Sequence, residues 1–187
     1  MTFPVTSLWE TPVWSGALAA EDLAGLPDLL GSDPEVRAAC TKRLGQALTD
    51  VAHTLAGPGA REPDTPWSAH TERWEAGYHC GLRYGKGTLQ AIVVVSATGT
   101  ARHAESGRIS LHDPRAGASN VFLPGLPWGR HHHLEPEPGN VLICPSWVAW
   151  SVAPVQDGHT VEVCLLHSTW AAGTYRTGLL LGQKLSG

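Results

Sequence analysis

Histidine and acidic side chains in two stretches of this chain are spaced as metal ligands could be. One stretch is a run of three histidines at positions 131–133, and the other is His112 followed by Asp113. Alternate residues of a β-strand point to opposite faces, so only the first and third histidines of the run could converge on one ion. Simpler interpretations stay open: the run is a solvated strand edge, and Asp113 begins a turn.

Glu162 is a second kind of candidate, because it is a carboxylate among the mainly apolar residues 160–167. An ionised carboxylate that points into an apolar interior is costly unless it is paired or catalytic. Burial can also move its pKa towards neutrality, as general acid/base catalysis requires. We therefore keep two interpretations: Glu162 is a catalytic base, or it forms an ion pair with Arg83 or Arg115.

Composition limits the partners of the chain. Lysine and arginine number 13 against 17 acidic residues, which gives a formal net charge of −4 and no basic surface for nucleic acid or an anionic membrane. No apolar run reaches the about 18 residues of a transmembrane helix, and no signal sequence is recognised, so a cytoplasmic protein is expected. The four cysteines lack C-x-x-C spacing and are expected to be reduced thiols.

A helix is predicted to begin near Pro34 and to end at the Gly-Pro-Gly of residues 57–59. Ser32 can cap its start, and Glu35 completes a capping box. Apolar residues recur at helical spacing after this start: Val36, Cys40, Leu44, Ala47, Leu48, Val51 and Leu55. One apolar stripe of this kind is typical of a helix that covers one face of a sheet.

Short apolar or alternating segments follow from Trp67 onward, and an edge strand is expected at residues 8–14. Strands are predicted at residues 70–79, 89–96, 108–112, 131–135, 141–144, 147–152 and 160–167. Such a series indicates an antiparallel sandwich or jelly-roll. We predict one domain over residues 1–187, with the strand and covering helices in 1–66 and the β-rich core in 67–187.

Several phrases of the chain resemble, in their order, those of one enzyme family. They are Thr11-Pro12-Val13-Trp14, Gly77-Tyr78-His79, Asp113-Pro114-Arg115, and the segment from Pro138 through Pro145-Ser146-Trp147 to Pro154. The family is that of small 2-oxoglutarate/Fe(II) oxygenases. The resemblance implies a mainly β protein with N-terminal helices, folded as a double-stranded β-helix of the jelly-roll, cupin-like kind.

The chain departs from this family where the cofactors would bind. In the family's phrase Pro-Ser-Trp-x-x-His the histidine binds iron, and here its position is Trp150, whose indole nitrogen can only donate. The family's other ligand pair falls on Leu82 and Tyr84. Its Arg-x-Ser, which holds 2-oxoglutarate, falls on Thr160 and Glu162. The resemblance thus implies that the cofactor ligands have been replaced, and no cofactor is expected.

With these replacements we expect an enzyme that acts on a small organic molecule, aromatic or apolar, without a metal. The family register places six residues around the former iron site: His79, Leu82, Tyr84, Trp150, Thr160 and Glu162. The expected catalytic residues are Glu162, Tyr84 and His79. The expected substrate contacts are Trp150, Leu82, Arg83, Thr160, Trp147 and Arg115. Isomerisation, cyclisation, dehydration and lyase reactions suit such groups, and specialised metabolism is the expected setting.

Two alternative functions stay open. A working hydroxylase that uses Fe(II) and 2-oxoglutarate would need relocated ligands, for which His79, His112 and Asp113 are the candidates. A register shift of one residue would turn every side chain of a strand to its other face. The third hypothesis is a non-catalytic binder of a small molecule or partner, since six of the eight tryptophans fall in the β-rich part. A homodimer is compatible with all three.

Overall fold

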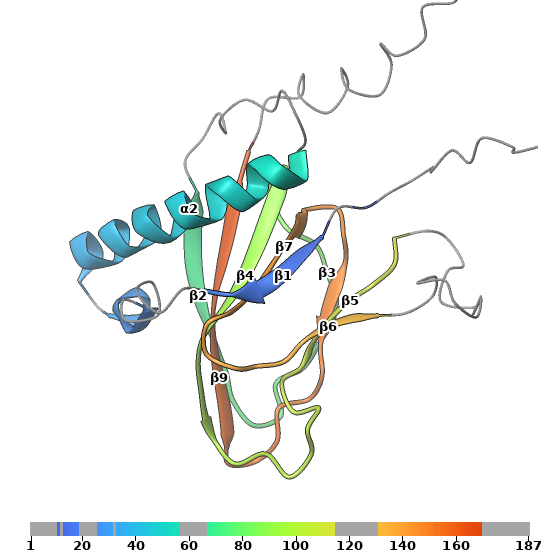
Figure 1. The fold of residues 1–187 in the computed structure, drawn as a ribbon. Helices are drawn as coiled ribbons and strands as arrows, with labels where there is room; N and C mark the ends of the chain where they lie inside the picture. The colour runs from blue at the N-terminus through green and yellow to red at the C-terminus, as the bar shows by residue number, and fades with distance from the viewer. Residues whose placement is uncertain are drawn as a thin grey trace, which may run out of the picture.

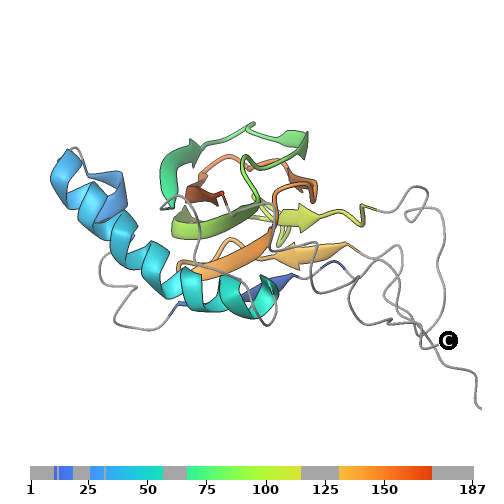
Figure 2. The ribbon, with the colours of Figure 1, turned by 90° about the horizontal axis from the view of Figure 1, so that it is seen from above.

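The computed structural model describes residues 11, 13–18, 26–31, 33–56, 67–114 and 131–169. Within them, strands dominate and form two sheets, and one long helix crosses the larger sheet (Figure 1). Viewed from above, this helix lies outside the strands and not between the two sheets (Figure 2). The predicted class, mainly β with N-terminal helices, is confirmed.

The long helix α2 (Pro34–Ala56) follows a short 3₁₀ helix, η1 (Leu26–Leu30). Its start is capped by Asp33, whose Oδ1 accepts the backbone N–H groups of Glu35 at 2.9 Å and Val36 at 3.3 Å. Ser32, the predicted cap, lies outside the described residues. No helix in the described part of the chain is long and apolar enough to cross a membrane.

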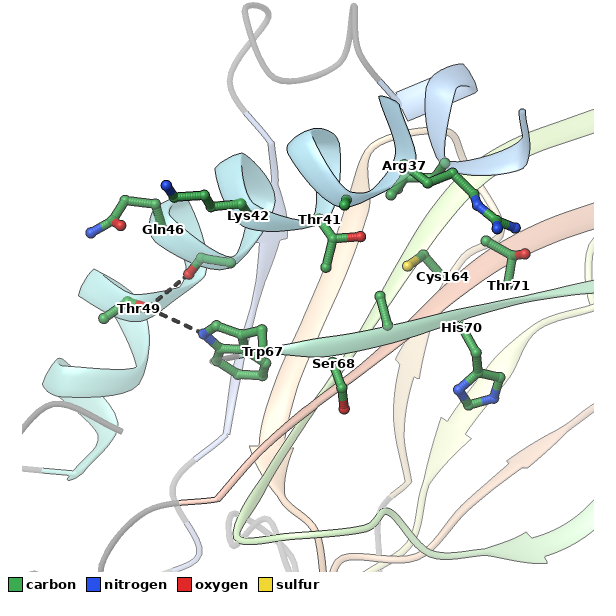
Figure 3. A pocket seen from close by; sticks show the side chains of 14 residues that line it. Arg37, Thr41, Lys42, Gln46, Thr49, Trp67, Ser68, His70, Thr71 and Cys164 are labelled. Atoms are coloured by element: carbon green, nitrogen blue, oxygen red, sulfur yellow. Dashed lines mark hydrogen bonds between the residues drawn. The ribbon is translucent and has the colours of Figure 1, made fainter. Parts of the chain in front are cut away.

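The predicted apolar stripe of α2 is confirmed for Cys40, Leu44 and Leu48, which are buried against the larger sheet. The prediction is wrong for Val36, which is exposed because it lies in the first turn, beyond the part of the helix that packs on the sheet. Figure 3 shows the layer between α2 and the strand that follows Trp67. The helix therefore covers one face of the sheet, as its stripe predicts.

All strand pairs are antiparallel. The larger sheet has the order β1 (Trp14–Ala17), β7 (Asn140–Pro145), β4 (Leu89–Gly99), β9 (His159–Ser168) and β2 (Ser68–Trp74). The smaller sheet has the order β3 (Cys80–Arg83), β8 (Trp150–Val152), β5 (Ile109–Leu111) and β6 (His132–Leu134). From β2 onward the chain alternates between the sheets, except at the β5–β6 pair, and this confirms the predicted double-stranded β-helix.

The edge strand expected at 8–14 is found at Trp14–Ala17 instead, and residues 1–10 and 12 lie outside the described residues. Two other predicted strands are shorter than expected because turns interrupt them. The expected strand at 70–79 ends at Trp74, and a turn follows in which Gly77 has a φ of +84° and donates its N–H to the Val155 carbonyl at 2.8 Å. The expected strand at 147–152 begins only at Trp150, because the Val148 N–H donates back to the Pro145 carbonyl at 3.0 Å. Both turns lie beside β3 and β8, so they fix which residues of those strands face inward.

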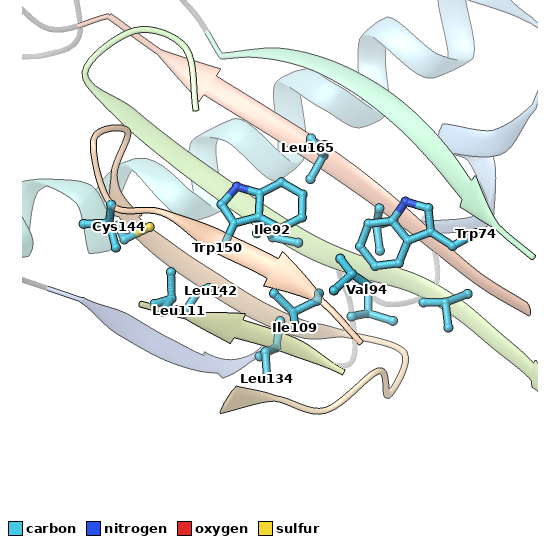
Figure 4. Close-up of a cluster of buried hydrophobic side chains, with 14 of the residues drawn as sticks. Trp74, Ile92, Val94, Ile109, Leu111, Leu134, Leu142, Cys144, Trp150 and Leu165 are labelled. Carbon is cyan, nitrogen blue, oxygen red and sulfur yellow. The ribbon is translucent and has the colours of Figure 1, made fainter. Parts of the chain in front are cut away.

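Two separate apolar layers result from the alternation of side chains along the strands. On β9, Val161, Val163 and Leu165 point between the sheets, where they pack with Trp74 and Trp150 (Figure 4). The intervening Cys164 and Leu166 point to the other side, against α2. The face on which a β9 residue lies therefore decides whether it can reach the interior of the jelly-roll.

Candidate functional site around Arg83

Trp150 lies at the inner face of β8, directly opposite Arg83 of β3 in the sheet. Its side chain is only 2% exposed. The indole Nε1 donates to Oε1 of Gln90 at 3.2 Å, and the Gln90 Nε2 donates to the Val148 carbonyl at 2.9 Å. The buried indole is thus fixed by packing and by a hydrogen bond, as buried tryptophans usually are.

Arg83 covers this indole from the side of β3. Its guanidinium carbon lies 4.7 Å from the centre of the Trp150 ring, a cation–π contact. Two guanidinium nitrogens donate to the two carboxylate oxygens of Glu72, each at 2.7 Å. This bidentate geometry is the strongest form of the arginine–carboxylate pair. Arg83 is therefore held between an aromatic ring and a carboxylate.

Two further aromatic residues complete the arrangement. Trp74 Nε1 donates to Glu72 at 2.9 Å, and the Tyr78 hydroxyl donates to the same oxygen at 3.4 Å. The rings of Trp74 and Tyr78 are stacked, with centres 5.3 Å apart and planes 6° apart. We call the five residues Glu72, Trp74, Tyr78, Arg83 and Trp150 the Arg83 cluster. Every polar group named in it has a partner within the protein.

The pKa values of the titratable groups in this cluster lie far from 7. Hydrogen bonds from Arg83, and then from Trp74, lower the pKa of Glu72 from 4.5 to about 2. Burial raises the pKa of Tyr78 to about 12. The hydrogen bonds with Glu72 raise the pKa of Arg83 further above its ordinary value. Near pH 7 the pair is fully charged and the phenol keeps its proton, so the cluster is suited to binding and not to proton transfer.

Three large exposed side chains lie on the chain segments next to Arg83 and Trp150, and we call them the rim. Leu82, Tyr84 and Trp147 expose 59%, 62% and 54% of their surface. Leu82 and Tyr84 flank Arg83 in the sequence, and the next residue, Gly85, donates its N–H to the Ser146 carbonyl at 2.9 Å. The structure thus brings five predicted site residues into one region: Leu82, Arg83, Tyr84, Trp147 and Trp150.

Glu162 and Thr160 do not belong to this region. They alternate with the inward residues Val161 and Val163, so they lie on the face of the sheet that α2 covers. Glu162 accepts a hydrogen bond from Ser96 Oγ at 2.6 Å. The expected inward orientation of Glu162 and Thr160 is wrong, because a shift of one residue in a strand reverses the face.

The ion-pair partner of Glu162 also differs from the expectation. Its Oε1 lies 3.4 Å from Nη1 of Arg73, the residue opposite it on β2. Arg83 is engaged by Glu72 instead, and Arg115 lies outside the described residues. Glu162 is therefore paired on the outer face of the larger sheet. This agrees with the interpretation of Glu162 as an ion-pair residue and not as a catalytic base.

The histidines singled out from the sequence lie in two places: His79 lies apart, whereas His112, His131 and His133 are neighbours, with the ring centres of His131 and His133 6.2 Å apart. His79 is exposed before β3, with Nδ1 3.2 Å from the Gly77 carbonyl. His112 Nε2 lies 2.7 Å from Ser151 Oγ, on the outer face of the smaller sheet, where its ring contacts His131 at 4.5 Å. The described residues include no group of three or more His, Cys, Asp or Glu side chains placed to hold a metal. The alternative ligand set of His79, His112 and Asp113 is thus not brought together.

Comparison with known proteins identifies the fold. No protein-family model and no curated protein sequence matches the chain. Among solved structures, the epimerase SnoN in complex with Fe3+, alpha ketoglutarate and nogalamycin RO has 14% identity and a TM-score of 0.55, covering 85% of this chain and 79% of that chain. This chain has the 2-oxoglutarate/Fe(II) oxygenase fold.

Two further structures support that assignment. AviO1 from Streptomyces viridochromogenes Tue57 has 11% identity and a TM-score of 0.54, over 87% of this chain and 91% of that chain. A Pseudomonas putida prolyl-4-hydroxylase has 13% identity and a TM-score of 0.52, over 85% of this chain and 89% of that chain. Identities at this level establish a shared fold, and the function has to be argued from the site.

Four described inward side chains of β3, β8 and β9 include no ligand for Fe(II). A facial iron site needs imidazole and carboxylate ligands that converge and leave open positions. The inner ends of β3 and β8 instead present the guanidinium of Arg83 and the indole of Trp150, and β9 presents Val161 and Val163. None of these four side chains can bind the metal. The described part of β9 also directs no arginine inward to hold 2-oxoglutarate.

Sequence reasoning missed the residues that complete the Arg83 cluster. Glu72 and Trp74 lie on β2, in the other sheet from Arg83, and no spacing rule links them. Gln90 could have been found, because it is the polar residue in the apolar segment 89–95 and is almost fully buried. A buried amide of this kind needs hydrogen-bond partners. In this chain its partners are the turn before β8 and the indole of Trp150.

Proposed function

We propose that this protein binds a small organic molecule on an oxygenase scaffold without using Fe(II) or 2-oxoglutarate. The observation that carries the proposal is Trp150, which is held by Gln90 and covered by Arg83. The family resemblance of the sequence aligns this residue with an iron-binding histidine. A similar fold in SnoN is described with nogalamycin RO bound. Specialised metabolism is therefore the setting that we propose.

The rim beside the Arg83 cluster is the proposed contact surface. Leu82, Tyr84 and Trp147 are large, apolar or aromatic, and more than half exposed. Aromatic side chains bury much area and stack on flat ligands at little entropic cost. A flat aromatic or apolar molecule with few polar groups suits this surface best.

Binding is better supported than acid/base catalysis. In the Arg83 cluster, the hydrogen bonds from Arg83 lower the pKa of Glu72 to about 2, and burial raises the pKa of Tyr78 to about 12. Glu162 lies on the opposite face of the larger sheet and is paired with Arg73. Catalytic roles for Tyr84 and His79 stay a prediction. Unchanged turnover of an identified substrate by Tyr84→Phe would remove the role of Tyr84.

The proposal is tested with indole and naphthalene as probes, by ligand-observed NMR in the presence of EDTA. Binding is expected to persist with EDTA and to weaken about tenfold in Trp147→Ser, the range of an aromatic contact residue. Val36→Ser, which removes an exposed apolar side chain on α2, is the control and is expected to bind as the parent does. Loss of binding with EDTA, or equal binding by Trp147→Ser, would contradict the proposal.

A further inference from the structure

A groove of about 970 Å³ lies between α2 and the strands β2 and β9, on the side of the larger sheet away from the Arg83 cluster (Figure 3). Small side chains line both sides. Ala38, Thr41 and Gly45 belong to the helix, and Ala69, Thr71 and Cys164 belong to the sheet. Larger residues at these positions would fill the space between helix and sheet. The groove therefore exists because the residues that face it are small.

Trp67 closes one end of the groove. A Cβ on Gly45 would lie 2.9 Å from Trp67 Cδ1, so the helix can approach the indole only because this residue is glycine. The Trp67 Nε1 donates to Thr49 Oγ1 at 3.1 Å, and that hydroxyl donates to the Gly45 carbonyl at 2.7 Å. The indole N–H, the threonine hydroxyl and the glycine carbonyl at this end are thus hydrogen-bonded to one another. Trp67 is itself 8% exposed, so its indole forms a packed, apolar end wall of the groove.

Two cationic side chains border the groove, and Arg37 is the one at the end away from Trp67 (Figure 3). The chain has more acidic than basic residues, 17 against 13, yet the groove is lined by Arg37 and Lys42 and by no Asp or Glu. Among the described residues, neither cation makes an ion pair. Figure 3 shows the Arg37 guanidinium on the side of Thr71 and Cys164, whereas Lys42 points away from β2. Burial raises the pKa of the Cys164 thiol to about 12, so it adds no negative charge.

We propose that this groove binds an amphipathic monocarboxylate, with its carboxylate on Arg37 and its apolar body against Ala69 and Cys164 towards Trp67. A guanidinium matches a carboxylate with two parallel hydrogen bonds. The hydroxyls of Thr41 and Thr71 lie in the same groove and can donate to the same group. The volume is that of an ordinary ligand pocket. This site does not depend on the function proposed for the rim.

Calorimetric titration of the full chain with decanoate and with decanol tests the inference. Decanoate is expected to bind, and decanol to bind about tenfold more weakly, because it lacks the charge-assisted hydrogen bonds. Arg37→Gln is expected to weaken decanoate binding about tenfold and to leave decanol unchanged. The control is Arg102→Gln, which removes the same charge from an exposed residue outside the groove and is expected to bind decanoate as the parent does.

A second variant fills the groove without touching its charge. Ala38→Leu places a larger side chain on the groove wall at a solvent-accessible helix position, so the fold should tolerate it. It is expected to weaken decanoate and decanol together, with an unchanged unfolding midpoint. Equal affinity for decanoate and decanol would overturn the proposal. So would an effect of Arg37→Gln no larger than that of Arg102→Gln, or the absence of binding.

Discussion

Two arginines of this protein, Arg83 and Arg37, differ in their surroundings and in their ion pairs. Arg83 is stacked on Trp150 and bonded twice to Glu72, in an interior that is filled with apolar side chains. Arg37 borders a groove on the outer face of the sheet, and it makes no ion pair among the described residues. The structurally similar SnoN is described with iron and alpha ketoglutarate. Among the described residues, apolar side chains pack between the sheets, and the groove of about 970 Å³ lies on the outer face of the larger sheet. The position of a ligand in a protein of similar fold therefore does not predict the position of a ligand here.

The packed interior should respond most strongly to loss of its central ring. Trp150→Ala is expected to lower the free energy of unfolding by about 4 kcal/mol, because it removes a buried aromatic side chain and leaves a cavity. Chemical denaturation measures this change. Trp147→Ala, at the exposed rim, should cost well under half as much. Equal losses for the two variants would show that Trp150 is not packed as described.

Glu72→Gln should have the next largest effect, about 2 kcal/mol, because it leaves Arg83 without its carboxylate over the indole. Side chains of this pair are 23% and 33% exposed, so the cost is smaller than for a fully buried pair. The matched control is Glu75→Gln, which breaks the exposed pair with Arg73 and should cost about 0.5 kcal/mol or less. Similar losses in both variants would contradict the distinct role of the Arg83 cluster.

The same pair predicts a dependence of stability on pH. The pKa of Glu72 is lowered from 4.5 to about 2 in the folded protein, so folding is favoured by its ionised form. This stabilisation is complete above pH 4.5 and is lost as the pH falls towards 2. Denaturation at several pH values should show a shallower acid-side slope in Glu72→Gln than in the parent. Identical slopes would mean that another carboxylate controls acid stability.

Glu162→Gln should have the smallest effect, about 0.5 kcal/mol, because an amide oxygen can still accept from Ser96 and only a long pair with Arg73 is lost. Binding of indole at the rim should not change, since Glu162 lies on the other face of the sheet. A large loss of indole binding would contradict that separation and would restore Glu162 to the site.

The sequence predicted this fold well and the orientation of its site residues less well. Periodicity and turn residues indicated most strands and the helix, and the Pro-Ser-Trp phrase located Trp150. The inward face of β9 was misjudged, because a shift of one residue exchanges Glu162 for Val161 or Val163. The pair between Glu72 and Arg83 joins strands of two different sheets, and only the folded chain shows it.

The most direct test of the account is an anaerobic titration of the purified protein with Fe(II) and 2-oxoglutarate, followed at the visible charge-transfer band. With Trp150 packed in the interior and Arg83 committed to Glu72, no band and no stoichiometric iron are expected. A band that saturates with one equivalent of iron would contradict the metal-independent function proposed for this protein.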